Sequence, residues 1–136
     1  MIVALPVPRR EARERALSLL YEAEAKEVPP VQVLADLPVP PDAFAATLVA
    51  GVGEHLGEID ALISRHSIGW ALERMPAIDR AVLRLAIFEL LGCDDTPTAV
   101  VLSEAVDLAG GYSTDESGRF VNGVLAAVAG EVRPVS

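Results

Sequence analysis

Residues 76–91 read PAIDRAVLRLAIFELL, and this stretch decides the fold class of the 136-residue chain. Apolar side chains occupy almost every face of a helix drawn through it, which is typical of a helix buried at the centre of a bundle. Pro76 suits the first helical position, where a missing N–H leaves no hydrogen bond unmade. Gly92 follows as an expected C-cap. The stretch therefore predicts a central core helix over residues 77–91.

Apolar residues also recur at helical spacing on both sides of this core helix. Further helices are expected over residues 9–27, 42–66, 98–110 and from 113 onward. The second of these is either one long helix or two helices joined near Gly57. Gly110-Gly111 should end the third, and a capping box from Ser113 to Glu116 should begin the fourth.

Prolines mark the remaining connection. Five of the ten lie between residues 29 and 41, which allows at most one short helix there. No segment alternates with a period of two, so no strand is expected. The fold class is therefore predicted as all-α, a compact bundle of about six or seven helices. We expect a single helical domain over residues 9–134, preceded by a flexible N-terminal arm over residues 1–8.

Composition and charge exclude several classes of protein. The net charge of −9 argues against a protein that coats nucleic acid through bulk charge, so any such site must be local. A single cysteine allows no intrachain disulfide, and two histidines eleven residues apart do not form a helical metal site. No catalytic triad, signal peptide or membrane span is recognisable. We expect a cytoplasmic protein without catalytic residues, metal or cofactor.

Two features of the apolar segments need separate interpretations. Glu89 falls on the same helical face as Val82 and Leu85, and a buried carboxylate must be paired or hydrogen-bonded. A structural pair or a helix-end cap is favoured over catalysis. The glycines of residues 51–57 lack the spacing of a phosphate-binding loop and lie in a helical pattern. They are interpreted as close-packing or hinge positions.

The stretch from Arg9 to Arg15 reads RREARER and carries a local charge of +2 in this acidic chain. On a helix, Arg9, Arg10 and Arg13 fall within an arc of roughly 100°. Guanidinium groups fanned in this way could contact successive phosphates of a single nucleic-acid strand. The alternative is a solvated face with Glu–Arg pairs at helical spacing. Charge alone slightly favours that alternative.

Four blocks, in order along the chain, carry a family resemblance. They read RREARERALSLLY (residues 9–21), ERMPAIDRAVLRLAIFELL (73–91), SEAVDLA (103–109) and DESGRFVNGVL (115–125). Together they resemble the bacterial transcription antitermination factors of the NusB family, over about residues 9–134. The resemblance implies a fold of two packed helical subdomains. It also makes RNA contact the favoured interpretation of the stretch from Arg9 to Arg15, ahead of a solvated helix face.

The same resemblance implies a function and its residues. It implies binding of boxA-type single-stranded RNA in ribosomal RNA leader transcripts, together with ribosomal protein ten of the small subunit (NusE). The pair would join an RNA polymerase antitermination complex that suppresses premature termination. By position, the implied RNA contacts are Arg9, Arg10, Arg13, Arg84, Phe120 and Asn122, and the implied protein-partner positions are Tyr21, Asp79 and Glu116. Phe120 and Tyr21 could instead be core residues, and Asn122 could cap or bridge helices.

This chain departs from the family pattern at three places. Glu11 stands where the family often has a third basic residue, residues 1–8 contain no Lys or Arg, and residues 66–70 lack a Tyr that some relatives use near RNA. These departures predict weak binding of free RNA and a greater dependence on the protein partner.

Two alternatives keep the helical fold and change its role. NusB-like domains also open certain ribosomal RNA cytosine methyltransferases, so a role in ribosomal RNA maturation is possible, although the length of this chain favours the stand-alone factor. The other alternative is a homo-oligomeric interaction protein, such as a homodimer, in which the RNA face is occluded.

Overall fold

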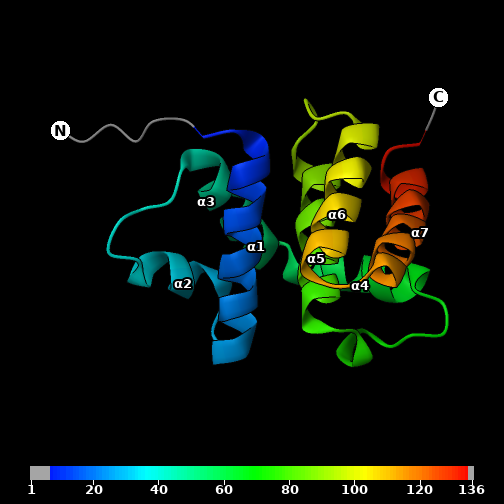
Figure 1. Ribbon diagram of the computed structural model, residues 1–136, viewed down its shortest axis with the longest axis horizontal. Coiled ribbons are helices and arrows are strands. Elements are labelled where there is room, and N and C mark those ends of the chain that lie inside the picture. The colour runs from blue at the N-terminus through cyan, green and yellow to red at the C-terminus, as the bar shows by residue number, and fades with distance from the viewer. Residues whose placement is uncertain (1–6, 135–136) are drawn as a thin grey trace.

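The computed structural model describes residues 7–134, and within them the chain forms seven α-helices, a short 3₁₀ turn and no strand (Figure 1). The elements are α1 (Arg9–Lys26), α2 (Pro30–Asp36), α3 (Ala43–Glu54), α4 (Leu56–His66), η1 (Leu72–Arg74), α5 (Ala77–Gly92), α6 (Thr98–Tyr112) and α7 (Asp115–Val132). The predicted all-α fold class is confirmed. Most of the arm expected over residues 1–8 lies outside the described residues.

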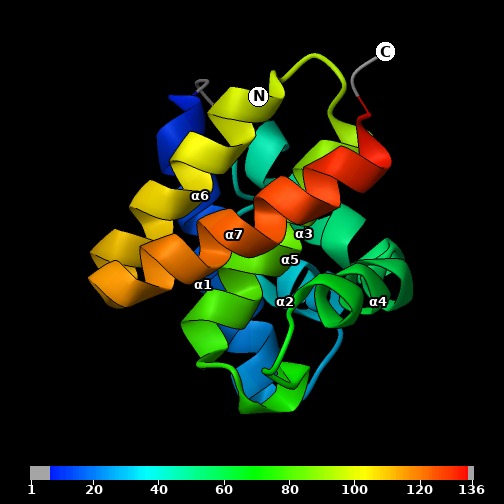
Figure 2. The same ribbon diagram turned by 90° about the vertical axis from the view of Figure 1, so that its right-hand side faces the viewer.

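The helices form two groups that pack against each other (Figure 1). In the first group α1, α2 and α3 contact one another, and in the second α5 contacts α4, α6 and α7. Figure 2 looks onto α6 and α7, which lie side by side over α5. Contacts of α5 with α1 and α3 join the two groups. The two packed helical subdomains implied by the resemblance are therefore present.

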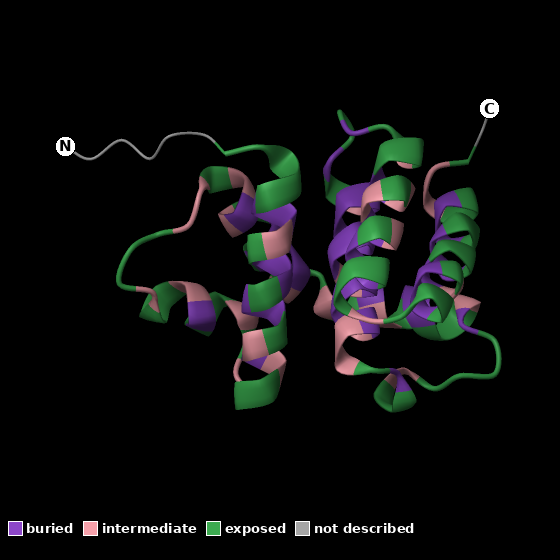
Figure 3. Cartoon of the chain, in the orientation of Figure 1, coloured by how far each residue is buried: buried purple, intermediate pink, exposed green. Residues whose placement is uncertain are grey.

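The central position of α5 follows from its sequence. Most of its residues are buried, and much of its ribbon is purple in Figure 3. The largest fully buried ones include Leu83, Leu85, Ile87 and Leu90. At roughly 1.5–3 kcal/mol for each fully buried aliphatic side chain, this helix supplies a large part of the hydrophobic stabilisation. The predicted core helix is confirmed.

A close contact between α3 and α5 explains one of the glycines. A Cβ atom on Gly51 would lie 2.2 Å from the ring of Phe88, so only a glycine lets the two helices approach this closely. The predicted close-packing role is confirmed at this position. The expected helix over residues 42–66 is two helices that meet at His55, two residues before Gly57.

Several predicted helix boundaries are off by one or two residues. Pro76 is the N-cap of α5, one position before the predicted place. The pair Gly110-Gly111 lies inside α6, which continues to Tyr112, because glycine lowers helix propensity without forbidding a further turn. At the start of α7, the Thr114 side chain accepts a hydrogen bond from the Ser117 backbone N–H at 3.1 Å. This cap replaces the predicted capping box from Ser113 to Glu116.

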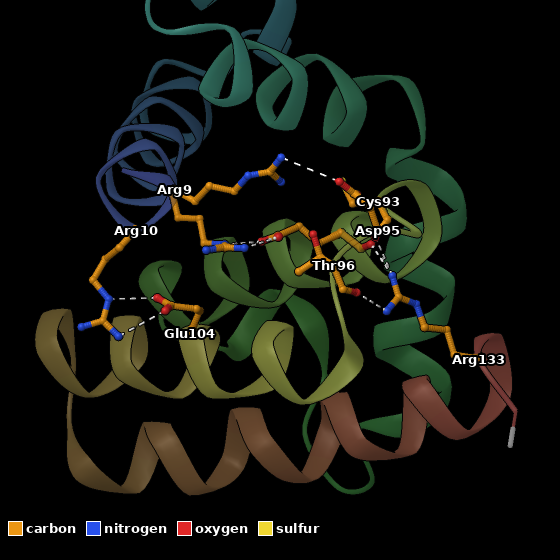
Figure 4. A network of polar contacts seen from close by, with 9 residues as sticks. Arg9, Arg10, Cys93, Asp95, Thr96, Glu104 and Arg133 are labelled. Atoms are coloured by element: carbon orange, nitrogen blue, oxygen red, sulfur yellow. Dashed lines mark hydrogen bonds and ion pairs between the residues drawn. The ribbon is translucent and has the colours of Figure 1, made fainter. Parts of the chain in front are cut away.

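The C-terminal end of α5 is closed by an arginine rather than by glycine. Gly92 is the last helical residue, and Cys93 follows with φ −121°, so no left-handed cap forms. Instead, Arg133, just after α7, donates hydrogen bonds to the backbone oxygens of Glu89, Leu90, Cys93 and Thr96 at 2.7–3.0 Å. A cation is favourable at the negative end of a helix dipole. Figure 4 shows this guanidinium against the α5–α6 turn.

Candidate functional site

The first turn of α1 presents two exposed arginines. The helix begins at Arg9, directly after Pro8, and its first backbone hydrogen bond runs from the Ala12 N–H to the Pro8 oxygen. The N–H groups of residues 9–11 therefore precede the intrahelical ladder, at the positive end of the helix dipole. Such a terminus favours an anion, and two guanidinium groups beside it add to that preference.

Arg9 is held loosely between an aromatic ring and a carboxylate. Its guanidinium carbon lies 4.1 Å from the centre of the Phe44 ring, which is a cation–π contact. Its Nη2 is 3.8 Å from Asp95 Oδ2 in the α5–α6 turn (Figure 4). Half of the Arg9 side chain is exposed, so the group is accessible to a ligand.

Arg10 faces two carboxylates of α6. Its Nε donates to Glu104 Oε2 at 3.0 Å, and its Nη2 donates to Glu104 Oε1 at 3.2 Å (Figure 4). The same Nη2 also donates to Asp107 Oδ2 at 2.8 Å. The hydrogen bond with Glu104 and the charges of both carboxylates raise the pKa of Arg10 above its usual value. The guanidinium therefore stays charged, and 58% of the side chain remains exposed.

Arg13 is buried and forms an ion pair with the carboxylate singled out on α5. Its Nε and Nη2 donate to the two oxygens of Glu89 at 2.9 and 2.8 Å, and the side chains are only 4% and 2% exposed. Burial acts to lower the pKa of Arg13, but the hydrogen bonds and charge of Glu89 outweigh it and raise the pKa. The predicted structural pairing of Glu89 is confirmed. The structure thus places Arg13 inside the protein, where it ties α1 to α5.

Arg84 is also engaged by a carboxylate. Its Nε and Nη2 each donate to Asp60 of α4 at 2.9 Å, and 18% of its side chain is exposed. Its Nη1 lies 3.7 Å from Glu24 Oε2 on α1. The side chain therefore connects α5 to α4 and α1, and little of it faces the surface.

Phe120 and Asn122 lie on different sides of α7. Phe120 is half-buried, and its ring packs on Trp70 with the centroids 4.9 Å apart and the planes tilted by 59°. Asn122 is exposed and lines a groove of about 360 Å³ between α6 and α7. Asp107 lines that groove and also the neighbouring groove between α1 and α6, which contains Arg10. A continuous surface therefore runs from Arg10 past Asp107 to Asn122.

The three predicted partner positions differ in accessibility. Tyr21 is 45% exposed on α1, and Glu116 is exposed in the first turn of α7. Asp79 is only 1% exposed, and its Oδ2 accepts a hydrogen bond from the Ser117 hydroxyl at 3.0 Å. Asp79 thus holds the start of α7 against α5 through Ser117, the residue that follows Glu116.

The acidic residues that face the arginines are not evident from the sequence. Glu104 and Asp107 stand three residues apart in α6, which is otherwise mostly apolar, and that spacing puts them on one face of the helix. Asp95 lies in the turn that Arg133 closes. Two carboxylates at i and i+3 in an apolar helix indicate a polar contact, but nothing in the neighbouring sequence indicates that the contact is with Arg10.

Other kinds of site receive no support from the described part of the chain. Residues 7–134 contain no cluster of three or more potential metal ligands. None of the helices described is long and apolar enough to cross a membrane. Cys93 is buried, and its burial, with the nearby charge of Glu89, raises the pKa of the thiol. These features give no basis for a metal centre or a reactive thiolate.

Comparison with known proteins gives concordant matches. The profile of the NusB family matches residues 10–130. The transcription antitermination protein NusB of Acidothermus cellulolyticus is 52% identical over 126 residues, covering 88% of this chain and 86% of that protein. The fold is similar to that of T. maritima NusB, with a TM-score of 0.84 and 38% identity over 93% of this chain and 94% of that one. A solved complex of the antitermination factors NusB and NusE with double-stranded RNA includes a similar chain, at a TM-score of 0.75 and 29% identity over 88% of this chain and 94% of that one.

Proposed function

The chain belongs to the NusB family of transcription antitermination proteins, and from that premise we propose that it binds boxA-type RNA of ribosomal RNA leader transcripts together with NusE, the small-subunit ribosomal protein ten. The RNA-bound pair would act within an RNA polymerase antitermination complex. Membership of this family of RNA-binding factors also agrees with the prediction that the chain is not an enzyme. The function would reside in a single domain over residues 9–134.

The main support for the proposal is the pair of exposed arginines in the first turn of α1. Arg9 and Arg10 present exposed guanidinium groups beside the N–H groups that begin the helix. Arginine offers planar, paired donors that suit phosphate oxygens, and the helix terminus adds a favourable electrostatic field. In a chain of net charge −9, such a local feature supports recognition of a few phosphates rather than coating of a long nucleic acid.

The neighbouring surface supports a path for the RNA strand. We assign phosphate contacts to Arg9 and Arg10, a base-edge contact to Asn122, and base stacking to the half-buried ring of Phe120 beside Trp70. Arg84 is assigned a smaller contribution to RNA binding, because its paired donors are engaged by Asp60. Arg13 is reassigned from an RNA contact to a residue that fixes α1 on α5.

The protein partner is assigned to a second area. Tyr21 and Glu116 are accessible and remain the proposed contacts with NusE, whereas Asp79 would act indirectly by positioning the start of α7. The solved complex of NusB, NusE and double-stranded RNA supports such a ternary arrangement in a related protein. For this chain we propose single-stranded boxA RNA as the ligand, since unstacked bases are needed for stacking on an aromatic ring.

Binding of a short boxA RNA, measured with and without ribosomal protein ten, tests the proposal. We expect modest affinity alone, clear enhancement with the partner, and weaker binding of a double-stranded form of the same RNA. Arg9→Ala and Arg10→Ala should each weaken binding, and Arg9→Ala should reduce the salt slope by about one. Lys26→Ala is the matched control, because Lys26 lies at the other end of α1 and is exposed beside Glu22.

Two outcomes would contradict the proposal. RNA binding that is absent both with and without the partner would exclude the function. Binding that neither arginine substitution changes would exclude the site. Light scattering of the free protein over a range of concentrations separates a monomer from the homodimer hypothesis, in which the RNA face would be covered.

A further inference from the structure

The donors of Arg10 are already occupied within the protein. A guanidinium group has five N–H donors, and a phosphate bound through two of its oxygens needs a pair of neighbouring donors on one edge of the group. Arg10 Nε and one Nη2 hydrogen point to Glu104, and the other Nη2 hydrogen points to Asp107. Within residues 7–134, Nη1 makes no hydrogen bond, yet both usable edges include the occupied Nη2. Neither edge is therefore open to a phosphate.

These contacts are displaceable, unlike the ion pair behind them. The side chains of Arg10 and Asp107 are 58% and 57% exposed, and that of Glu104 is 19% exposed. Water therefore screens the contact with Asp107, and a competing anion has access to Arg10 from that side. The pair of Arg13 with Glu89 is 4% and 2% exposed, and its separation would leave a charge buried. The fold thus fixes one arginine permanently and holds another in a contact that solvent and ligands can reach.

The position of the carboxylates gives the contact a role in RNA recognition. Asp107 lines the groove that contains Arg10 and also the groove that contains Asn122. A strand that reaches both residues must pass Asp107, whose negative charge repels its phosphates. Glu14, hydrogen-bonded by the Tyr112 hydroxyl at 2.8 Å, adds a further carboxylate to the first groove.

We propose that Glu104 and Asp107 form a carboxylate clamp that sets the RNA affinity and selectivity of Arg10. A phosphate gains both donors of one edge only by displacing the clamp. RNA that is attracted by charge alone therefore binds weakly, whereas RNA that is also held through its bases or through the protein partner overcomes the competition. This inference rests on the proposed function, since it concerns the same RNA site.

The double variant Glu104→Gln/Asp107→Asn tests the clamp. We expect it to bind boxA RNA about three- to tenfold more tightly than the wild type, with a salt slope steeper by about one, because Arg10 then contributes a full phosphate contact. In an Arg10→Ala background the same two changes should improve binding less than about twofold. Glu54→Gln/Glu73→Gln is the matched control, since it changes the net charge equally at two exposed residues on other elements.

The outcomes separate failure of the clamp from failure of the proposed function. The clamp is overturned if RNA binding is present and weakened by Arg10→Ala but the double variant binds no better. It is also overturned if the charge-matched control gains as much, or if the gain persists in the Arg10→Ala background, because bulk charge would then explain it. Absence of RNA binding from the wild type and both double variants, with and without the partner, overturns the proposed function itself. Asp107→Asn alone, on a 57% exposed side chain, provides a second variant should the double variant melt early.

Discussion

Replacing Arg13 by alanine should strongly destabilise the protein, because Arg13 is a buried partner of Glu89 rather than an exposed RNA contact. The change leaves Glu89, which is 2% exposed, without either of its hydrogen bonds at 2.8 and 2.9 Å. An uncompensated buried charge of this kind lowers the free energy of unfolding by about 3–5 kcal/mol. Small domains have roughly 5–15 kcal/mol in total, so the melting temperature should fall by on the order of 10–20 °C.

A companion variant separates the ion pair from the space it occupies. Arg13→Met/Glu89→Leu removes both charges and keeps apolar volume between α1 and α5, so its free energy of unfolding should lie within about 2 kcal/mol of the wild type. Urea denaturation followed by circular dichroism measures all three proteins. A loss below about 1 kcal/mol for Arg13→Ala, or a double variant as unstable as the single one, would refute the argument from burial.

RNA binding by the folded double variant then decides the role of Arg13. If Arg13 only fixes α1 on α5, Arg13→Met/Glu89→Leu should keep the boxA affinity within about twofold of the wild type, whereas Arg10→Ala weakens it. A stable double variant that has lost RNA binding would restore Arg13 as a direct contact. The comparison uses the same RNA and salt concentration throughout, since affinity depends strongly on both.

Two further predictions concern packing and pH. Gly51→Ala should destabilise the protein by about 1–3 kcal/mol in thermal melts, because the added Cβ would lie 2.2 Å from the Phe88 ring, whereas Gly123→Ala, with no heavy atom within 4 Å of the added Cβ, should stabilise α7 by up to about 1 kcal/mol. The hydrogen bond with His66, with added support from Arg65, holds the pKa of Glu131 below 4.5. A lowered carboxyl pKa contributes stability above pH 4.5 that is lost as the pH falls through the folded-state value, so acid melts of Glu131→Gln should depend less on pH there than those of the wild type.

The core of the fold is predictable because its signals are local. The apolar stretch from residue 77 to 91 specifies a buried helix, and a buried carboxylate at Glu89 requires a partner whatever the fold. The identity of that partner is not local, since Arg13 lies 76 residues earlier in the chain. A helical projection placed Arg13 at the edge of the apolar stripe, and the projection does not show which neighbouring helix covers that edge.

The candidate site is likewise predictable only where its signals are local. Arg9 and Arg10 are exposed, as an arginine-rich first turn suggests, but their acidic neighbours belong to the α5–α6 turn and to α6. Helix ends were also misjudged where a tertiary contact decides them. Gly92 is not a left-handed cap, because Arg133 satisfies the carbonyl oxygens there instead. Contacts between segments distant in the sequence thus account for most of the differences between the predicted and the observed structure.

The hydrogen bonds of Arg133 have a consequence for the order in which the chain folds. Proteins begin to fold during synthesis from the N-terminal side. The backbone oxygens at the end of α5 receive their guanidinium donor only after residue 133 has been added, long after α5 itself has been made. The turn that carries Asp95, and with it the charge facing Arg9, is therefore fixed late. A nascent chain that has only reached α7 lacks Arg133, so the turn that faces its first arginine does not yet have these hydrogen bonds.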